Sequence, residues 1–317
     1  MPQKEGLTNK MPLLNNQETN SNITSLHNFI YKELVAMTSN VITNYSINMS
    51  NRENNPFLLF EDTSIKKYMA LGRSVDAQLG NRIQRIIFYI SRLRYGLQNV
   101  PNIITLDICN EGTKSISCTL YSVPHDLDER EQNKNFDPYK QIILVGSNKT
   151  YKEIKKLLHV KATSNSIIKV DFTFNNIDED TFKFIETMNN KRIPVDLIYF
   201  DCQNTELNNA NTYEIKMGGN LDTKNAKSNA QEVKDLLTLF GFLQNNHSYF
   251  ATCYGECSSS VVSNIEKIIG NDAILNNIDF WNKIIPTLEN TFTYHEFIDV
   301  FKDAFKSSDL ENKLKNL

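Results

Sequence analysis

Apolar residues recur at helical spacing in two stretches near the N-terminus of this chain. The first stripe consists of Leu26, Phe29, Ile30 and Leu34. The second stripe consists of Leu79, Ile83, Ile86, Ile87 and Ile90. Residues that return every three or four positions share one face of a helix, so we predict helices over 23–37 and 78–94. Gly96 and Pro101 are expected to end the second helix.

The middle of the chain alternates between apolar and polar positions, as half-buried strands do. Strands are predicted at 102–109, 114–123, 140–146, 166–174, 193–201, 212–218 and 247–255. Further helices are predicted at 150–160, 178–190, 226–240, 261–269, 280–285 and 294–305. The first two strands flank Glu111 and Gly112 as a hairpin, and the Asn-rich segment 202–211 is predicted to be a turn. Helices interleaved with strands indicate an α/β fold.

The same order of elements predicts the domain organisation. Residues 1–22 are polar and are predicted to form a flexible N-terminal arm. One domain is predicted over 23–317, with its core at about 78–255 and a C-terminal helical part over 256–317. The expected core is a mixed sheet flanked by helices, with helical elaborations at both ends of the chain.

Composition narrows the class of protein without indicating a partner. Hydrophobic residues make up 40% and charged residues 22% of the 317 residues, which is ordinary for a soluble globular protein. The net charge of -3 does not indicate a nucleic-acid-binding protein, although a local basic cleft would suffice for one. No apolar run is as long as a membrane span and no signal-peptide pattern begins the chain, so we expect no membrane partner and a cytoplasmic location.

The cysteines bear on redox state and on zinc. There are five of them, scattered and odd in number, which fits a reducing compartment better than a disulfide framework. Cys253 and Cys257, with His247 upstream, leave a zinc site as an alternative. Their spacing is loose and a second ligand pair is absent, so buried thiols are the favoured interpretation.

The candidate chemistry lies on two of the predicted strands. Asp196 is near the start of one, and Glu214 and Lys216 lie on the next. Side chains alternate along a strand, so Glu214 and Lys216 share one face while Ile215 points to the core. Two carboxylates brought together repel each other unless a cation lies between them. Mg²⁺ accepts such carboxylates together with a backbone carbonyl, here that of Ile215, and with water.

The spacing Asp-x17-Glu-x-Lys is weak evidence by itself, because it also fits an exposed strand with a surface ion pair. Asp201 is a rival for the first acid, at the spacing Asp-x12-Glu-x-Lys. We favour Asp196 because it stands at the start of its strand, which makes the two arms of the hairpin nearly equal in length. Lys216 beside the metal would orient a water for attack on phosphorus.

These residues resemble a known nuclease pattern. "PVD" and "EIK" resemble the two halves of the PD-(D/E)xK nuclease core, with one extra residue between Pro194 and Asp196. "GRSVDAQLGNRIQRI", "YEIKMGGNLDTKNAKSNAQEVKDLL" and "NDAILNNIDFWNKIIP" with "YHEFIDVF" resemble segments of Type II restriction endonucleases of the TdeIII type. The resemblance covers about half of the chain and leaves residues 100–190 unmatched.

The resemblance implies a restriction-endonuclease-like fold and a Mg²⁺-dependent enzyme that cuts both strands of double-stranded DNA at a short specific site. It also implies a homodimer, because a two-fold site is matched by a two-fold protein, and a companion DNA methyltransferase as a separate protein. An acid on the first helix joins the metal site in many nucleases of this fold, which makes Asp76 a candidate ligand. A first-turn carboxylate that only favours the helix dipole is the equally weighted alternative.

Basic and amide side chains near these segments are candidates for DNA contact. Asn bonds adenine bidentately, and Lys and Arg bind phosphate. The candidates are Arg73, Arg82, Lys224, Asn225, Lys227 and Asn229. A solvated helix start in an Asn-rich protein is the alternative for the last four. Two other functions stay open, namely a non-specific PD-(D/E)xK nuclease in repair or defence and a non-catalytic DNA-binding α/β protein.

Overall fold

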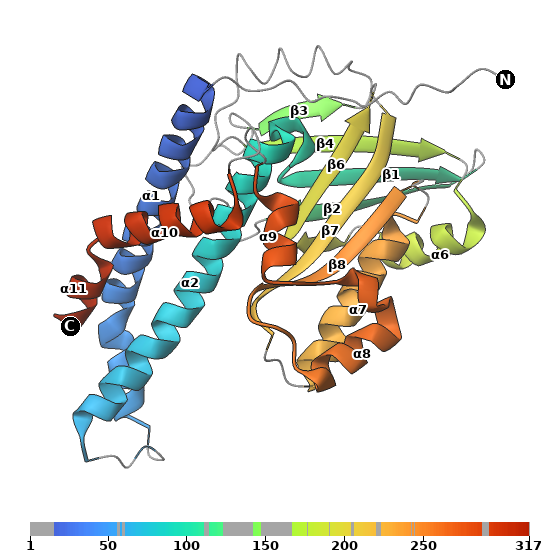
Figure 1. Ribbon diagram of the computed structural model, residues 1–317. Helices are drawn as coiled ribbons and strands as arrows, with labels where there is room; N and C mark the ends of the chain where they lie inside the picture. Colours follow the sequence, from blue (N-terminus) through green and yellow to red (C-terminus); the bar gives the residue numbers. More distant parts are fainter. Residues whose placement is uncertain are drawn as a thin grey trace.

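Two long helices form an arm beside the rest of the protein (Figure 1). The computed structural model describes residues 16–55, 58, 61–110, 114–122, 142–146, 167–175, 177–189, 191–203, 206–219, 223–241, 243, 245–286 and 292–316. Helix α1 (Asn16–Glu53) and helix α2 (Thr63–Tyr95) pack along each other. Asp62 caps α2 by accepting the backbone N–H of Ser64. Across the described ranges, no helix is both long and apolar enough to span a bilayer.

Both N-terminal helices are confirmed, and both are longer than the apolar stripes that predicted them. Beyond the stripes, Met37 and Val41 of α1 pack in a smaller cluster with Leu71 and Val75 of α2. Because α1 begins at Asn16, residues 16–22 of the predicted arm are helical, and residues 1–15 lie outside the described residues. The predicted helix at 150–160 also lies outside them.

Sheet A has the strand order β3-β4-β1-β2-β5. Its strands are β1 (Ile103–Asn110), β2 (Lys114–Ser122), β3 (Ile142–Gly146), β4 (Ile167–Asn175) and β5 (Arg192–Val195). The β1–β2 hairpin is antiparallel as predicted, and the other neighbours are parallel. Four of the five strands of sheet A lie in the segment 100–190, which the nuclease resemblance left unmatched.

Sheet B has the strand order β6-β7-β8-β9. Its strands are β6 (Leu197–Gln203), β7 (Glu206–Gly218), β8 (Asn245–Tyr254) and β9 (Ile274–Asn276). Strand β7 is antiparallel to β6 and parallel to β8. The prediction of a turn over 202–211 was wrong, because most of this Asn-rich segment extends β7 and pairs with β6 and β8. Pairing along the whole of β6 outweighs the low strand propensity of Asn.

The remaining helices pack around the two sheets. They are α6 (Glu179–Thr187), α7 (Thr223–Leu239), α8 (Ser259–Ile269), α9 (Ile278–Ile284), α10 (Tyr294–Ser307) and α11 (Leu310–Lys315). Single 3-10 turns occur at Leu97–Asn99 and Asn271–Ala273. Asp178 caps α6 by accepting the backbone N–H of Thr181. Helix α11 has fewer than two turns and β9 only three residues, so neither was predicted from the sequence.

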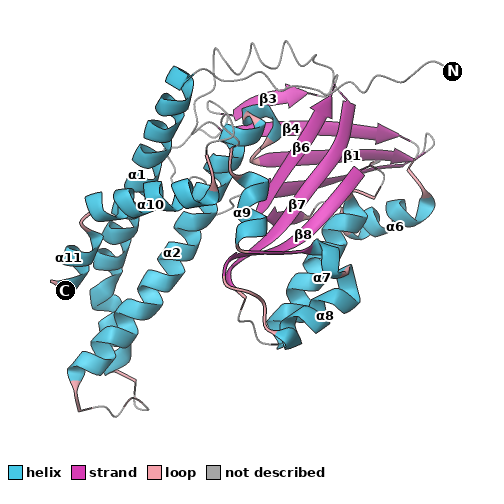
Figure 2. Cartoon of the chain, in the orientation of Figure 1, coloured by secondary structure: helices cyan, strands magenta, loops and turns pink. Residues whose placement is uncertain are grey.

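Sheet B is buried on both faces. Successive residues of β6 alternate between two cores, so that Tyr199 packs toward α2 and α9, and Phe200 packs toward α7 and sheet A. Figure 2 shows the strands of sheet B lying across those of sheet A. The α/β class is thus confirmed, but the single mixed sheet that the sequence predicted is two mixed sheets.

Candidate active site

Asp196 stands where the chain passes from one sheet to the other. Strand β5 ends at Val195 in sheet A, and β6 begins at Leu197 in sheet B. The hydroxyl of Ser122, at the end of β2, donates to the Asp196 carbonyl oxygen at 3.4 Å. The predicted strand 193–201 is therefore broken at Asp196, and the break holds this residue in a fixed place between the sheets.

The Asp196 carboxylate is oriented by two donors. The Gln84 side-chain amide of α2 donates to Oδ1 at 2.8 Å. The Ile215 backbone N–H of β7 donates to Oδ2 at 2.7 Å. The N–H and C=O groups of one strand residue point to the same neighbour, so the Ile215 carbonyl also faces the edge where Asp196 lies. Two donors on one carboxylate leave it a single orientation.

Glu214 and Lys216 share the face of β7 that is turned toward α7, as the alternation predicted. The Lys216 Nζ lies 2.6 Å from Glu214 Oε1. This pair is not the surface ion pair of the alternative interpretation, because the Glu214 side chain is only 11% exposed and the Lys216 side chain 31%. Ile215 packs on the opposite face, against the core beside α2.

Strand register separates the two rivals for the first acid. Leu197 pairs with Tyr213, which brings Asp196 next to Glu214. Asp201 pairs with Asn209 instead. At about 3.4 Å per residue, positions 209 and 214 are roughly 17 Å apart along β7, so Asp201 does not reach Glu214.

Burial and mutual repulsion make the ionised forms of the Asp196 and Glu214 carboxyl groups unfavourable. Burial raises the pKa of Asp196, even though the Ile215 N–H and Lys216 oppose the rise. Burial and then repulsion by Asp196 raise the pKa of Glu214. Burial lowers the pKa of Lys216, but the attraction of Glu214, Asp196 and Glu232 outweighs it and the net shift is upward. One ammonium group therefore does not balance the negative charge of the cluster.

Glu232 of α7 adds a third carboxyl group. Partial burial and repulsion by Glu214 raise its pKa, and the two carboxyl groups are close enough to share a hydrogen bond. A cavity of about 340 Å³ opens beside these acids. Its described lining consists of Phe184, Met188, Ile193, Pro194, Asp196, Glu214, Glu232, Asp235, Leu236 and Leu239. This lining has four carboxyl groups and no basic side chain, so the cavity attracts cations and repels a bare phosphate.

Gly218 and Gly219 end β7 beside the loop that follows β8. A Cβ on Gly219 would lie 2.6 Å from the Cys257 backbone nitrogen, and a Cβ on Gly218 would lie 3.0 Å from the Tyr254 ring. The two glycines therefore serve close packing of the chain behind the Glu-x-Lys strand, rather than approach to a ligand.

The oxygen donors fit a hard divalent cation. Asp196, Glu214 and the Ile215 carbonyl are ligand types that Mg²⁺ accepts, and each carboxylate oxygen keeps a lone pair beyond its present hydrogen bond. Within the described residues, no group of three or more His, Cys, Asp or Glu side chains is arranged to hold a metal ion. Water would thus complete the shell, as it does for most protein-bound Mg²⁺. Cys253 and Cys257 are buried free thiols and belong to no such group, which favours the buried-thiol interpretation over the zinc alternative.

Asp76 does not lie beside the other candidate metal ligands. Asp76 is exposed on α2, and Gln84 is the residue of this helix that contacts Asp196. At about 1.5 Å per residue, positions 76 and 84 are roughly 12 Å apart along the helix axis. The alternative of a first-turn carboxylate fails as well, since α2 begins at Thr63.

The candidate DNA-contact residues fall into three groups. Arg82, a candidate phosphate contact, forms an ion pair with the buried Glu33, with its Nη1 3.1 Å from Oε2. Asn229 is only 7% exposed because it lies on the side of α7 that packs inward, so it does not present its amide to a base. Arg73 and the α7 residues Lys224, Asn225 and Lys227 are exposed.

Gln84 and Glu232 were not predicted from the sequence. Gln84 follows Ile83 of the apolar stripe on α2, where a polar residue has no local signature of function. Glu232 is one of many charged residues on α7. Only the packing of α2 and α7 against opposite faces of sheet B brings them to Asp196 and Glu214.

No protein-family model matches this sequence, and no curated protein is significantly similar to it.

Proposed function

We propose that this protein is a Mg²⁺-dependent nuclease that hydrolyses phosphodiester bonds of double-stranded DNA, and specifically a Type II restriction endonuclease. The observation that supports it best is the meeting of Asp196, Glu214 and Lys216 at the junction of β5, β6 and β7. This is the arrangement that the resemblance to the PD-(D/E)xK pattern requires, and strand register and a backbone hydrogen bond produce it in this chain.

Each residue has a separate task in the proposed reaction. Asp196, Glu214 and the Ile215 carbonyl would hold the metal, and Gln84 would keep Asp196 in its orientation. A bound Mg²⁺ supplies a site for the attacking water and offsets charge that develops on the phosphate. The Lys216 ammonium, released in part from Glu214, donates to that water or to a phosphate oxygen.

The electrostatics support metal dependence. The carboxyl groups that line the cavity repel a phosphodiester, and a divalent cation reverses this repulsion. Substrate would therefore be admitted to the reacting position only when the cation is present. The homodimer and the companion DNA methyltransferase implied by the resemblance belong to the same proposal, together with the cytoplasmic location expected from the sequence.

The test is incubation of the purified protein with supercoiled plasmid DNA, with Mg²⁺ or with EDTA, beside a Lys216→Ala control. Discrete fragments in Mg²⁺ alone support the restriction endonuclease. A smear identifies a nuclease without sequence specificity and contradicts the site-specific part of the proposal. Intact DNA from several sources, with the protein shown to be folded, contradicts the nuclease itself.

A further inference from the structure

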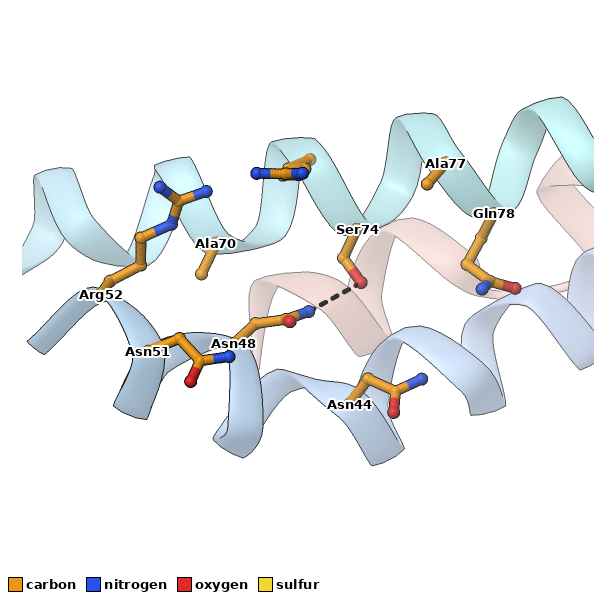
Figure 3. A pocket seen from close by; sticks show the side chains of 9 residues that line it. Asn44, Asn48, Asn51, Arg52, Ala70, Ser74, Ala77 and Gln78 are labelled. Atoms are coloured by element: carbon orange, nitrogen blue, oxygen red, sulfur yellow. Dashed lines mark hydrogen bonds between the residues drawn. The ribbon is translucent and has the colours of Figure 1, made fainter. Parts of the chain in front are cut away.

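A polar groove lies between the second half of α1 and the first half of α2, away from the sheets (Figure 3). Its volume is about 510 Å³. Its lining consists of Asn44, Asn48, Asn51, Arg52, Ala70, Arg73, Ser74, Ala77 and Gln78. At about 1.5 Å per residue, the stretch from position 44 to position 52 extends roughly 12 Å along α1. The groove is therefore long enough for more than one phosphate group.

Two arginines give this groove its charge. Arg52 belongs to α1 and Arg73 to α2, and in the described part of the chain neither makes an ion pair. No carboxylate lines the groove. Glu53 and Asp76 are the adjacent acids on the same helices, and neither pairs with these arginines. A guanidinium without a carboxylate partner is the group that binds phosphate oxygens most readily.

The amides supply hydrogen-bonding groups along the groove beside the arginines. Asn48 Nδ2 donates to Ser74 Oγ at 3.3 Å, and Asn40 Nδ2 donates to Gln78 Oε1 at 3.2 Å. These bonds fix the two walls of the groove and leave the Gln78 amide nitrogen free to donate. Figure 3 shows Arg52 at one end of the groove and Asn44 with Gln78 at the other. The groove thus combines a cationic end with a neutral polar end.

Helix α2 connects this groove to the candidate active site. Arg73 lies in the groove, and Gln84 farther along the same helix contacts Asp196. At about 1.5 Å per residue, positions 73 and 84 are roughly 17 Å apart along the axis. A duplex that runs parallel to α2 covers this distance in about five base-pair steps at 3.4 Å per step.

We propose that the groove binds the phosphate backbone of the DNA substrate about five base pairs to one side of the cleaved bond, with Arg52 and Arg73 as the phosphate contacts. The proposal rests on the proposed function, because it takes the position of the DNA from Asp196. The length and open side of the groove favour a continuing backbone over an enclosed small molecule. The amide side chains contact the neighbouring sugar and backbone groups of the same strand.

The test compares wild-type protein with Arg52→Gln/Arg73→Gln. Lys302→Ala/Lys306→Ala removes the same charge from the exposed surface of α10 and serves as the matched control. Fluorescence anisotropy measures binding to a long labelled duplex in Ca²⁺ at several salt concentrations. Loss of two phosphate contacts should reduce the slope of log affinity against log salt by about 1.8 for each bound subunit, and should weaken binding at least about tenfold at low salt. The control should keep the wild-type slope.

Duplex length gives a second measurement. The duplex is shortened on either side until fewer than about five base pairs flank the cut. The wild type then also lacks the phosphate contacts of Arg52 and Arg73, so its affinity should equal that of the arginine variant. An unchanged slope in the arginine variant overturns the proposal. So does tight binding of a deoxynucleoside monophosphate that the arginine variant loses while its duplex affinity stays the same.

The outcome separates this inference from the nuclease itself. Loss of slope in a protein that cuts no DNA supports the groove and contradicts the proposed function. Mg²⁺-dependent cleavage with an unchanged slope supports the proposed function and contradicts the groove.

Discussion

The side-chain amide of Gln84 donates to the carboxylate of Asp196 across 2.8 Å, although the two residues are 112 positions apart in the chain. This bond ties α2 to the corner between the sheets. The second donor to Asp196 is the Ile215 N–H, between Glu214 and Lys216 on β7. Helix, corner and strand therefore hold the candidate carboxylates as one unit.

Removing either candidate metal carboxylate should stop cleavage. Asp196→Asn and Glu214→Gln keep side-chain size and delete the charge that would bind Mg²⁺, so we expect cleavage to fall at least about 10³-fold. Timed plasmid digestion in Mg²⁺ measures this. Asp201→Asn is the control and should cut like wild type, because β6 places position 201 away from Glu214. Full activity in Asp196→Asn with loss in Asp201→Asn would reverse the assignment.

Gln84 should act by positioning rather than by chemistry. Gln84→Leu removes the donor to Asp196 Oδ1 and should weaken metal affinity or activity about 10–100-fold, as loss of an orienting hydrogen bond does at metal sites. The expected signature is a higher Mg²⁺ concentration for half-maximal cleavage, with thermal stability close to wild type. A lower melting temperature with an unchanged Mg²⁺ requirement would identify a purely structural residue.

Stability should depend on pH and on Mg²⁺ through the same carboxyl groups. Their pKa values are raised above 3.8 for Asp196 and 4.5 for Glu214, so the folded protein binds more protons than the unfolded chain. This contribution to stability is complete below about pH 4 and is lost as pH rises through the raised pKa values. In EDTA, Asp196→Asn should therefore gain melting temperature relative to wild type as pH approaches neutrality.

The same melting experiment detects Mg²⁺ binding as a shift in melting temperature. Millimolar Mg²⁺ near neutral pH should stabilise the wild type by binding the ionised carboxylates of the folded state. Asp196→Asn should respond much less. Equal Mg²⁺ shifts in the two proteins would show that the cation binds elsewhere.

Two glycines should respond to alanine in opposite ways. At Gly219 a Cβ would lie 2.6 Å from the Cys257 backbone nitrogen, so Gly219→Ala should destabilise the fold by about 1–3 kcal/mol. At Gly72, within α2, a Cβ meets no atom within 4 Å, and Gly72→Ala should stabilise by up to about 1 kcal/mol. Urea unfolding measures the change in the free energy of unfolding for both variants. A neutral Gly219→Ala would contradict the close packing behind β7.

Glu33 should matter for stability rather than for DNA. Its side chain is 7% exposed and pairs with both Arg82 and Arg85. Glu33→Ala removes this carboxylate from two partly buried guanidinium groups and should destabilise the fold by about 3–5 kcal/mol. Arg82→Ala should destabilise less and should leave the salt dependence of DNA binding unchanged. A smaller slope of log DNA affinity against log salt for Arg82→Ala would instead identify Arg82 as a phosphate contact.

The sequence determined the elements that depend on local patterns. Apolar spacing placed α1, α2, α7 and α10, and alternation placed β1, β2 and β8, because these periodicities follow directly from helix and strand geometry. Alternation also put Glu214 and Lys216 on one face. The Asn-rich start of β7 was misread because pairing with β6 and β8, which no local pattern reports, decides its conformation.

Only the tertiary structure decided which side chains meet. The division into two sheets breaks the predicted strand at Asp196, and register then brings this residue, not Asp201, to Glu214. Helix packing places Gln84, not Asp76, against Asp196. It also buries Asn229 and pairs Arg82 with Glu33. Such contacts join positions far apart in the chain. Their geometry follows from how whole elements pack, which the residue spacing within a single element does not encode.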